Sequence, residues 1–375
     1  MEEWKEYKLG DVLTIKYGKD HKQLADGDIP IYGSGGIMRY GERSLYDGPS
    51  ILIPRKGSLN NVIYANKPFW TVDTMFWSVI NDSIANPLFV YYSICKKDFA
   101  SLNVGSAVPS LTVPVIEDID ILLPPKATQD KVASVLKSLD DKIKVNRRIN
   151  DNLEQQAQAL FKSWFVDFEP FKNGQFVDSE LGKIPEGWKV GYLSEIADII
   201  MGQSPNGSTY NENGEGIIFY QGRAEFGTRF PSIRLFTTNP TRIAPANSIL
   251  ISVRAPVGDI NITHKECCIG RGLASAVSRT NKSAFLLYTL FSLKSDLDKF
   301  NAEGTVFGSI NRKALETLKI LIPTNDLISK FEAIVASMDQ QILILHIESE
   351  NLKILRDTLL PKLMSGELKI NDINN

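Results

Sequence analysis

This sequence of 375 residues has few cysteines, few histidines and no long apolar run. Cys95 stands alone and Cys267 and Cys268 are adjacent, so the chain offers neither a disulfide framework nor a CxxC metal pattern. The three histidines are scattered without metal-ligand spacing. No apolar stretch approaches the roughly 20 residues that cross a bilayer, and the charged start MEEWKEYKLGD lacks a signal-peptide apolar region. We therefore expect a reduced, cytoplasmic protein.

Sequence patterns for catalysis are also missing. There is no GxxxxGK[ST] phosphate loop, and GSGG (33–36) is not the GxGxxG of a dinucleotide site. No Ser-His-Asp or Cys-His arrangement can be defended. NPLF (86–89) invites comparison with the NPPF loop of adenine methyltransferases but lacks its second proline. An asparagine followed by proline more simply predicts the start of a helix. The absence of these catalytic patterns favours a binding protein over an enzyme.

The sequence does contain an internal repeat. GSAVPSLTVPVIEDIDILLPP (105–125) aligns without a gap with GTVFGSINRKALETLKILIPT (304–324). Upstream, ILIPRKG (51–57) parallels ILISVRAPVG (249–258), and each run ends in an arginine and a glycine. A repeat that occurs only twice, in segments this long, predicts a duplicated domain rather than a solenoid.

The start of each copy is repeated as well, but there the matched residues lie 184 positions apart (188 − 4), against 199 in the gapless repeat (304 − 105). The matched residues are Trp4 with Trp188, Leu9 with Leu193 and Gly18 with Gly202. The first halves of the two copies therefore differ in length, while the later halves stay in step. This is the pattern of an insertion between shared elements.

A long amphipathic segment follows each repeated phrase. Alternating steps of four and three residues predict two coiled-coil helices of roughly 35–40 residues. Asn146 interrupts the first seam, and a polar residue there typically fixes register. The predicted seam residues are Val132, Leu136, Leu139, Ile143, Ile149, Leu153, Leu160 and Trp164 in the first helix, and Phe331, Val335, Met338, Ile342, Leu345, Leu352, Leu355 and Leu359 in the second.

These observations predict an α+β fold. We expect two α/β globular units related by a pseudo-two-fold axis and separated by two long antiparallel coiled-coil helices. The alternative, two unrelated bundle helices, does not explain the matching period.

Loops rich in glycine, hydroxyls, amides and cations occur at corresponding places in both copies. Glycine lets a backbone approach a partner closely, and Arg, Gln, Asn, Ser and Lys are the side chains that contact bases and phosphates. Arg55, Arg254 and Arg271 are the foremost candidates, with Gln203, Gln221 and Asn311 as candidate adenine readers. The full candidate set is Lys19, Ser34, Arg55, Lys56, Ser58, Ser106, Ser110, Gln203, Ser204, Gln221, Arg223, Arg254, Arg271, Ser309, Asn311 and Arg312. Each residue could instead brace its own loop.

At this point the residues carry a resemblance to a known family. LFKSWFVDFEPFK (160–172) and LRDTLLPKLMSGEL (355–368) resemble the central and C-terminal regions of specificity subunits of type I restriction-modification systems. GDIPIYGSGGIM (27–38), followed by ILIPRKGS (51–58) and PFWTVDTMFW (68–77), resembles one common kind of their target recognition domain. MGQSPNGSTYN (201–211) resembles the opening of another kind.

The resemblance implies a non-catalytic subunit with four parts: recognition domain 1 (1–124), a central helical region (125–180), recognition domain 2 (181–323) and a C-terminal helical region (324–375). It also implies that each domain recognises one half of a split DNA target while the helices set the gap between the halves. Partners would be double-stranded DNA, two methylation subunits and, through them, a translocase-nuclease subunit. The chain would hold no cofactor or metal of its own, because the partner subunits would bind S-adenosylmethionine, ATP and Mg²⁺.

Two other functions remain open at this stage. In one, NPLF belongs to a methylase within this chain; in the other, the chain is a structural adaptor whose globular ends bind protein. The residues of the central phrase, Trp164, Phe165 and Phe168, could likewise contact a partner subunit or seal the helix against the second unit.

Overall fold

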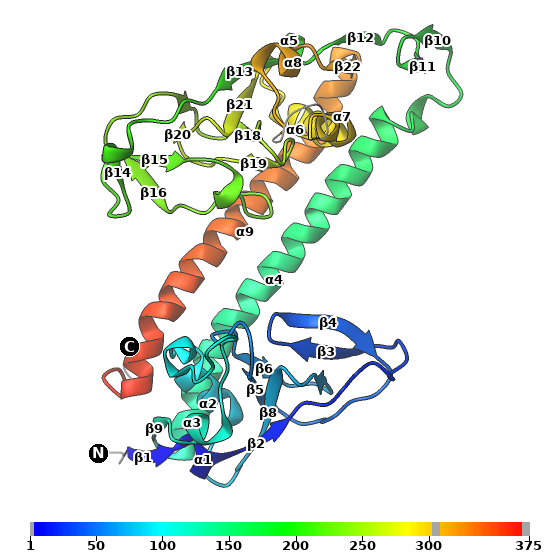
Figure 1. Cartoon of the computed structure of the whole chain (residues 1–375). Coiled ribbons are helices and arrows are strands. Elements are labelled where there is room, and N and C mark those ends of the chain that lie inside the picture. The colour runs from blue at the N-terminus through cyan, green and yellow to red at the C-terminus, as the bar shows by residue number, and fades with distance from the viewer. Residues whose placement is uncertain (1–3, 302–307, 370–375) are drawn as a thin grey trace. The chain divides into compact units, whose positions relative to one another are not determined.

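The computed structural model describes residues 4–301 and 308–369. The chain divides into two compact units: unit 1 comprises Met1–Val145 and Glu348–Asn375, and unit 2 comprises Asn146–Ile347. Helices α4 (Lys126–Phe165) and α9 (Asn325–Ser365) each contribute one half to each unit (Figure 1).

Unit 1 combines small sheets with short helices. Its elements besides the long helices are β1 (Lys5–Lys8), α1 (Leu9–Val12), β2 (Leu13–Tyr17), β3 (Ile29–Gly33), β4 (Gly36–Gly41), β5 (Ser50–Pro54), β6 (Ile63–Ala65), β7 (Trp70–Thr71), β8 (Met75–Ile80), α2 (Pro87–Ile94), the 3-10 helix η1 (Phe99–Leu102), α3 (Val113–Glu117) and β9 (Asp120–Leu123). The strands form sheets in the orders β2-β8-β5-β6 and β4-β3-β7 and the pair β1-β9. Its main core joins Leu9, Ile51 and Phe89 to Leu136 of α4 and Leu363 of α9.

Unit 2 is built from more strands. Its elements are η2 (Glu169–Phe171), β10 (Phe176–Ser179), β11 (Gly182–Pro185), β12 (Lys189–Tyr192), α5 (Leu193–Ile196), β13 (Ala197–Met201), η3 (Gly207–Thr209), β14 (Tyr210–Asn211), β15 (Ile217–Tyr220), η4 (Arg223–Glu225), β16 (Leu235–Thr237), β17 (Ile243–Ala244), β18 (Ile249–Ser252), β19 (Ile260–Ile262), β20 (Cys267–Ile269), β21 (Leu273–Ser278), α6 (Ser283–Ser292), α7 (Lys294–Lys299), α8 (Arg312–Glu316) and β22 (Lys319–Ile322). The larger sheets have the orders β13-β21-β18-β19 and β14-β16-β15-β20-β17, and β12 pairs with β22 and β10 with β11.

The predicted duplication is confirmed by the matching framework of the two units. The four-stranded sheets have equivalent orders, and the pair β12-β22 repeats the pair β1-β9. Leu9 and Leu193 both begin a short helix and are fully buried. A β-carbon on Gly18 would collide with the carbonyl of Val72, and one on Gly202 would collide with that of Gly270. Glycine is thus needed at both places for close backbone approach.

The difference in length between the two copies lies in the second sheet. This sheet has three strands in unit 1 and five in unit 2. Both versions keep one parallel pairing, β3 with β7 and β15 with β20. Strands β14, β16 and β17 surround this pairing in unit 2. The insertion predicted in the first half of the second copy therefore enlarges this sheet. Gly304 of the repeated phrase lies outside the described residues.

Both long helices are confirmed, with 40 residues in α4 and 41 in α9. Within unit 1, Lys142 of α4 forms an ion pair with Glu348 of α9 at 3.3 Å. Within unit 2, Nδ2 of Asn150 donates to the carbonyl of Ile342 at 3.1 Å. A second contact in each unit gives the direction: Asp140 of α4 bonds Arg356 of α9 in unit 1, and Phe161 packs against Phe331 in unit 2. Within each unit the contacted position moves back along α9 as it advances along α4, so the two segments run antiparallel. Asn146 is fully buried, as expected for a polar seam position.

Two predicted seam residues are wrong. Ile149 is 40% exposed and Leu355 is 46% exposed. Their places facing the opposite helix are taken by the neighbouring polar residues Asn150 and Arg356; Nη1 of Arg356 bonds Asp140 of α4 at 2.6 Å. A prediction from hydrophobic periodicity assigns the seam position to the apolar residue next to it wherever the true seam residue is a hydrogen-bonded polar side chain.

The aromatic phrase after α4 packs inside unit 2. The ring of Phe165 lies 5.9 Å from that of Trp188 and 5.1 Å from that of Phe331, and the ring of Phe168 meets Trp188 edge-on at 5.4 Å. Trp164 contacts Phe331 at 6.3 Å. Of the two predicted alternatives, the internal seal between helix and globular part is confirmed.

NPLF forms the start of helix α2, as predicted. The side chain of Asn86 accepts hydrogen bonds from the backbone N–H of Leu88 and of Phe89, and Pro87 is the first helical residue. Nδ2 of Asn86 donates to Asp130 of α4 at 2.7 Å. The asparagine side chain is thus used to cap a helix and attach it to α4.

Candidate nucleic-acid interface

The candidate site is organised around one junction that occurs in both units. In unit 1, Lys56, just after β5, forms an antiparallel bridge with Ser110. In unit 2, Arg254, just after β18, forms the same bridge with Ser309. The structure therefore brings together four of the predicted residues, two in each unit, at equivalent positions.

The backbone hydrogen bonds around this junction repeat as well. In unit 1 the N–H of Leu111 donates to the carbonyl of Arg55 at 2.9 Å, and the N–H of Gly57 donates to that of Pro109 at 3.0 Å. In unit 2, Ile310 donates to Val253 at 3.0 Å and Ala255 to Gly308 at 2.9 Å. Each unit thus holds a cationic loop against a serine-containing loop with the same backbone framework and different side chains.

In unit 1 the guanidinium of Arg55 is positioned by two contacts. It lies 5.5 Å from the centre of the Tyr17 ring, and its Nη1 donates to the carbonyl of Asp73 at 3.2 Å. Tyr17 itself is 58% exposed and supports the arginine from one side. Lys56 and Ser58 are exposed next to it. The arrangement presents a cation over an aromatic ring at the surface, which favours a planar anionic or aromatic partner.

Ser34 joins this group from the β3–β4 hairpin. Nδ2 of Asn61 donates to the Ser34 carbonyl at 2.8 Å. A β-carbon on Gly57 would lie 3.0 Å from Oγ of Ser34, and Gly57 has a φ of +89°. The turn of the hairpin and the loop after β5 therefore touch, and glycine permits both the approach and the backbone conformation.

Lys19 and Ser106 lie in exposed loops of unit 1. The N–H of Lys19 donates to the carbonyl of Thr71 at 2.8 Å, so its backbone is fixed against β7. The neighbouring Asp20 has its pKa below the usual value because the N–H of Lys22 donates to its carboxylate. A permanent negative charge beside Lys19 weakens the positive potential at this edge.

Four predicted residues of unit 2 gather around Gly270. The N–H of Arg271 donates to Oγ of Ser204 at 3.2 Å, and the N–H of Gln203 donates to the carbonyl of Ile269 at 2.9 Å. A β-carbon on Gly270 would lie 2.5 Å from the carbonyl of Gln221. Loops after β13, β15 and β20 thus meet at one place, and they present two glutamines and an arginine together.

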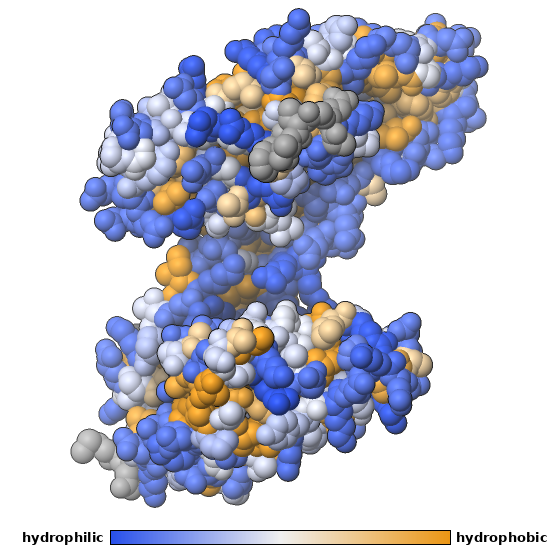
Figure 2. Space-filling view, viewed as in Figure 1, coloured by the Kyte–Doolittle hydropathy of each residue, from blue (hydrophilic) through white to orange (hydrophobic). Residues whose placement is uncertain are grey.

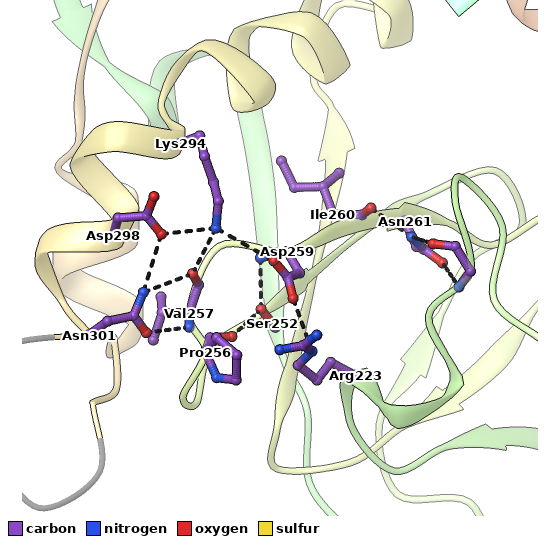
Figure 3. Close-up of polar contacts among 11 residues, drawn as sticks. Arg223, Ser252, Pro256, Val257, Asp259, Ile260, Asn261, Lys294, Asp298 and Asn301 are labelled. Carbon is purple, nitrogen blue, oxygen red and sulfur yellow. Dashed lines mark hydrogen bonds and ion pairs between the residues drawn. The ribbon is translucent and has the colours of Figure 1, made fainter. Parts of the chain in front are cut away.

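The loop that carries Arg254 is held from several sides (Figure 3). Oγ of Ser252 accepts from the N–H of Asp259 and donates to the carbonyl of Pro256, both at 2.8 Å. Oδ1 of Asn301 accepts from the N–H of Val257 at 2.6 Å. These contacts leave Arg254 exposed at the tip of a fixed loop.

Three of the predicted residues take part in local contacts. Nε of Arg223 pairs with Asp259 at 2.9 Å (Figure 3), which braces the Arg254 loop. The side-chain oxygen of Asn311 caps α8 by accepting from the N–H of Ala314 at 2.9 Å. Arg312 pairs with Glu316 one helical turn away at 2.7 Å. A role of these residues in DNA binding stays a prediction, as it does for the rest of the candidate set.

Sequence reasoning missed one cation of the unit 2 cluster. The hydroxyl of Thr241 donates to the Gln203 carbonyl, and the N–H of Ile269 donates to the carbonyl of Arg242 at 2.9 Å, so Arg242 stands beside the cluster and is exposed. The run TTNPTR (237–242) contains no glycine, so it does not share the pattern of the other candidate loops. Its polar residues and proline were the available signal.

The charge of the two globular parts differs in sign. Residues 1–124 contain 12 Lys and Arg against 15 Asp and Glu, whereas residues 188–323 contain 15 against 11. Because phosphate contacts depend on cations, unit 1 is the weaker candidate for binding a DNA backbone by charge alone. Figure 2 shows hydrophobic and hydrophilic patches side by side on the visible face of each unit.

Within residues 4–301 and 308–369, no group of three or more His, Cys, Asp or Glu side chains could hold a metal ion. In the same part of the chain, no helix is both long enough and apolar enough to cross a membrane.

Comparison with known proteins identifies the family of this chain. The family model described as the type I restriction modification DNA specificity domain matches residues 1–155 and 185–352. A Methanocaldococcus jannaschii protein, provisionally named the specificity subunit of the type I restriction enzyme MjaX, is 32% identical over 82% of this chain and 75% of its own length. The HindI specificity subunit of Haemophilus influenzae is 24% identical over 98% of this chain and its full length.

A solved structure shares the fold. The type I restriction-modification S subunit of M. genitalium superimposes with a TM-score of 0.67 at 17% identity, covering 97% of this chain and 96% of that one. The chain belongs to the family of type I restriction modification DNA specificity domains, and it contains two of them. It is a specificity subunit and not a catalytic subunit.

Proposed function

We propose that each unit of this chain recognises one half of a split DNA target through its repeated junction. The observation that carries the proposal is the bridge that pairs Lys56 with Ser110 and Arg254 with Ser309. The same backbone framework presents different side chains in the two units. One molecule can therefore recognise two unlike half-sites, and the target is asymmetric.

The side chains at the two junctions and in the unit 2 cluster around Gly270 suit contacts in the major groove. Arg55, Arg254 and Arg271 can each donate two hydrogen bonds to guanine, and Gln203 and Gln221 can do the same for adenine. Half-sites approached from one face of B-DNA lie about 34–36 Å apart. The long helices α4 and α9 are the elements that set this gap.

The partners of the proposal supply what this chain lacks. Two methylation subunits dock on the helical regions, bind S-adenosylmethionine and contribute much of the phosphate contact; a translocase-nuclease subunit that uses ATP and Mg²⁺ joins them. The excess of acidic residues in 1–124 is the reason for assigning phosphate contacts to the partners. The chain alone is then a weak DNA binder, and the complex works in the cytoplasm, where host DNA lies.

Mapping methylated adenines tests the proposal. A host lacking its own modification systems would carry this chain with its methylation subunit, and single-molecule sequencing would identify the modified sites. We expect one bipartite, asymmetric motif with a constant gap. A single continuous motif, or methylation without sequence preference, would contradict the proposal. A host with the methylation subunit alone is the control.

A further inference from the structure

The loop from Asn103 to Ser110 in unit 1 is tightly built for a surface loop. The side-chain oxygen of Asn103 accepts from the N–H of Gly105 and from that of Ser110, both at 2.8 Å, and its Nδ2 donates to the Gly105 carbonyl at 3.0 Å. The N–H of Val104 donates to the Ser110 carbonyl at 3.0 Å. A β-carbon on Gly105 would collide with the carbonyl of Val108. One side chain and one glycine thus fix the whole loop.

This fixed loop displays two apolar side chains to solvent. Val104 and Val108 are each 55% exposed, whereas Leu111, directly after the loop, is 2% exposed and belongs to the core. The hydrogen bonds that fix the loop are made by the Asn103 side chain and by backbone groups, so they require no particular side chain at positions 104 and 108. The two valines are therefore available for contact with a partner at the surface.

The loop also has a fixed neighbour. The N–H of Gly57 donates to the Pro109 carbonyl at 3.0 Å, and Lys56 bridges to Ser110. Val104 and Val108 therefore stand on the loop that lies against the cationic loop of unit 1. Any duplex that Arg55 and Lys56 approach is within reach of the valine loop as well.

One group in the major groove is apolar, namely the 5-methyl of thymine, and apolar side chains recognise it by contact. Unit 1 carries more acidic than basic residues in 1–124, so its affinity for DNA rests less on phosphate charge than on such contacts. We propose that Val104 and Val108 contact thymine 5-methyl groups in the half-site that unit 1 recognises, and that they thereby help to specify it. This inference rests on the proposed function.

Deoxyuridine in place of thymine tests the inference, because it removes the methyl group alone. The half-site of unit 1 is first identified as the half that changes when residues 1–124 are exchanged. Affinity of the complex assembled with its methylation subunits is then measured on duplexes with uracil in that half or in the other half. We expect a loss of about fourfold for each methyl group contacted in the unit 1 half.

A double-mutant cycle separates this contact from other effects of the valines. The Val104→Ala, Val108→Ala variant should bind the thymine duplex more weakly and should lose nothing further on the uracil duplex. Ile233→Ala, at a 40% exposed position of unit 2, serves as the control and should keep the full uracil penalty in the unit 1 half.

Three results would overturn the inference: no uracil penalty in the unit 1 half, a penalty that the double variant retains, or weaker assembly with the methylation subunits as the only effect of the variant. The last would make the loop a protein contact. The proposed function fails in a different way, because the exchange of residues 1–124 would then leave both halves of the target unchanged.

Discussion

Among the ion pairs of the described residues, Arg229 of unit 2 is the most deeply buried cation. Its side chain is 7% exposed. Its Nη2 pairs with Asp339 of α9 at 2.6 Å, its Nη1 pairs with Glu154 of α4, and Nη1 also bonds the hydroxyl of Tyr288 at 3.2 Å. Burial of the carboxylate raises the pKa of Asp339. The arginine thus ties the β15–β16 segment to both long helices inside unit 2.

We expect Arg229→Ala to lower the free energy of unfolding of the chain by about 3–5 kcal/mol, because it leaves two partly buried carboxylates, Glu154 and Asp339, without their cation. Urea denaturation measures this change. The control is Arg279→Ala, which removes an ion pair with Asp198 in which both side chains are at least half exposed and should cost about 1 kcal/mol or less. Equal effects of the two substitutions would show that the network contributes nothing special.

The cysteines should react slowly in the native protein. Burial raises the pKa of the Cys267 thiol to about 12 and that of Cys95 to about 11. Because the thiolate is the reactive form, iodoacetamide at pH 8 should modify both far more slowly than in urea. The labelling rate should still rise between pH 8 and pH 10, since both raised values lie above this range. Mass spectrometry of peptides from timed reactions checks this. Rapid labelling of native Cys267 at pH 8 would contradict it.

At the scale of elements, the glycine after the first long strand of each unit is a packing requirement. In unit 2, Gly202→Ala would push a methyl group into the carbonyls of Gly270 and Ile269, at the cluster that holds Gln203 and Arg271. We expect a loss of about 1–3 kcal/mol in unfolding free energy, typical of overpacking, together with weaker DNA binding by the assembled complex.

The matched control for this substitution is Gly207→Ala. A β-carbon there meets nothing within 4 Å among the described atoms, and Gly207 does not have a positive φ. Stability and binding should stay close to those of the unchanged chain. If Gly202→Ala behaved like Gly207→Ala in thermal unfolding, the close contact between Gly202 and the carbonyl of Gly270 would be contradicted.

The long helices allow a test of the gap between half-sites. Deleting residues 143–149 from α4 and 343–349 from α9 removes one heptad from each and keeps the phase of both seams. Each helix shortens by about 10 Å, which corresponds to about three base pairs of B-DNA at about 3.4 Å each. We expect the mapped target to keep both halves and to lose about three base pairs from the gap. An unchanged gap would refute the role of the helices.

Periodicity and repetition made most elements predictable, for physical reasons. The long helices follow from apolar residues on one face, and the matched domains follow from a gapless repeat with glycine and buried leucine at equal places. The seam could not be predicted around Asn150 and Arg356, because their burial depends on partners in the other helix. The five-stranded sheet of unit 2 could not be predicted either, since its strands of two to four residues carry little pattern.

The candidate site was predictable in its location but not in its details. Glycine, arginine and serine at matching places indicated the junction that the structure contains. Sequence alone could not show that Arg223 pairs with Asp259, because the two lie on different segments. It also assigned no role to Val104 and Val108, since an isolated apolar residue gives no sign of whether it is buried or exposed.

For the whole molecule, the proposed recognition of two half-sites requires that the two units act independently. Each unit has its own sheets, its own core and its own junction, and no core cluster of described residues joins the two units. A target recognised by such a chain should be separable into two parts, each assigned to one unit.

Exchange of residues 1–124 for the corresponding segment of another specificity subunit is the most direct test. Methylated adenines would be mapped in the same host with the same methylation subunit. We expect a new sequence in one half of the target, with the other half and the gap unchanged. A change in both halves, or in neither, would contradict it.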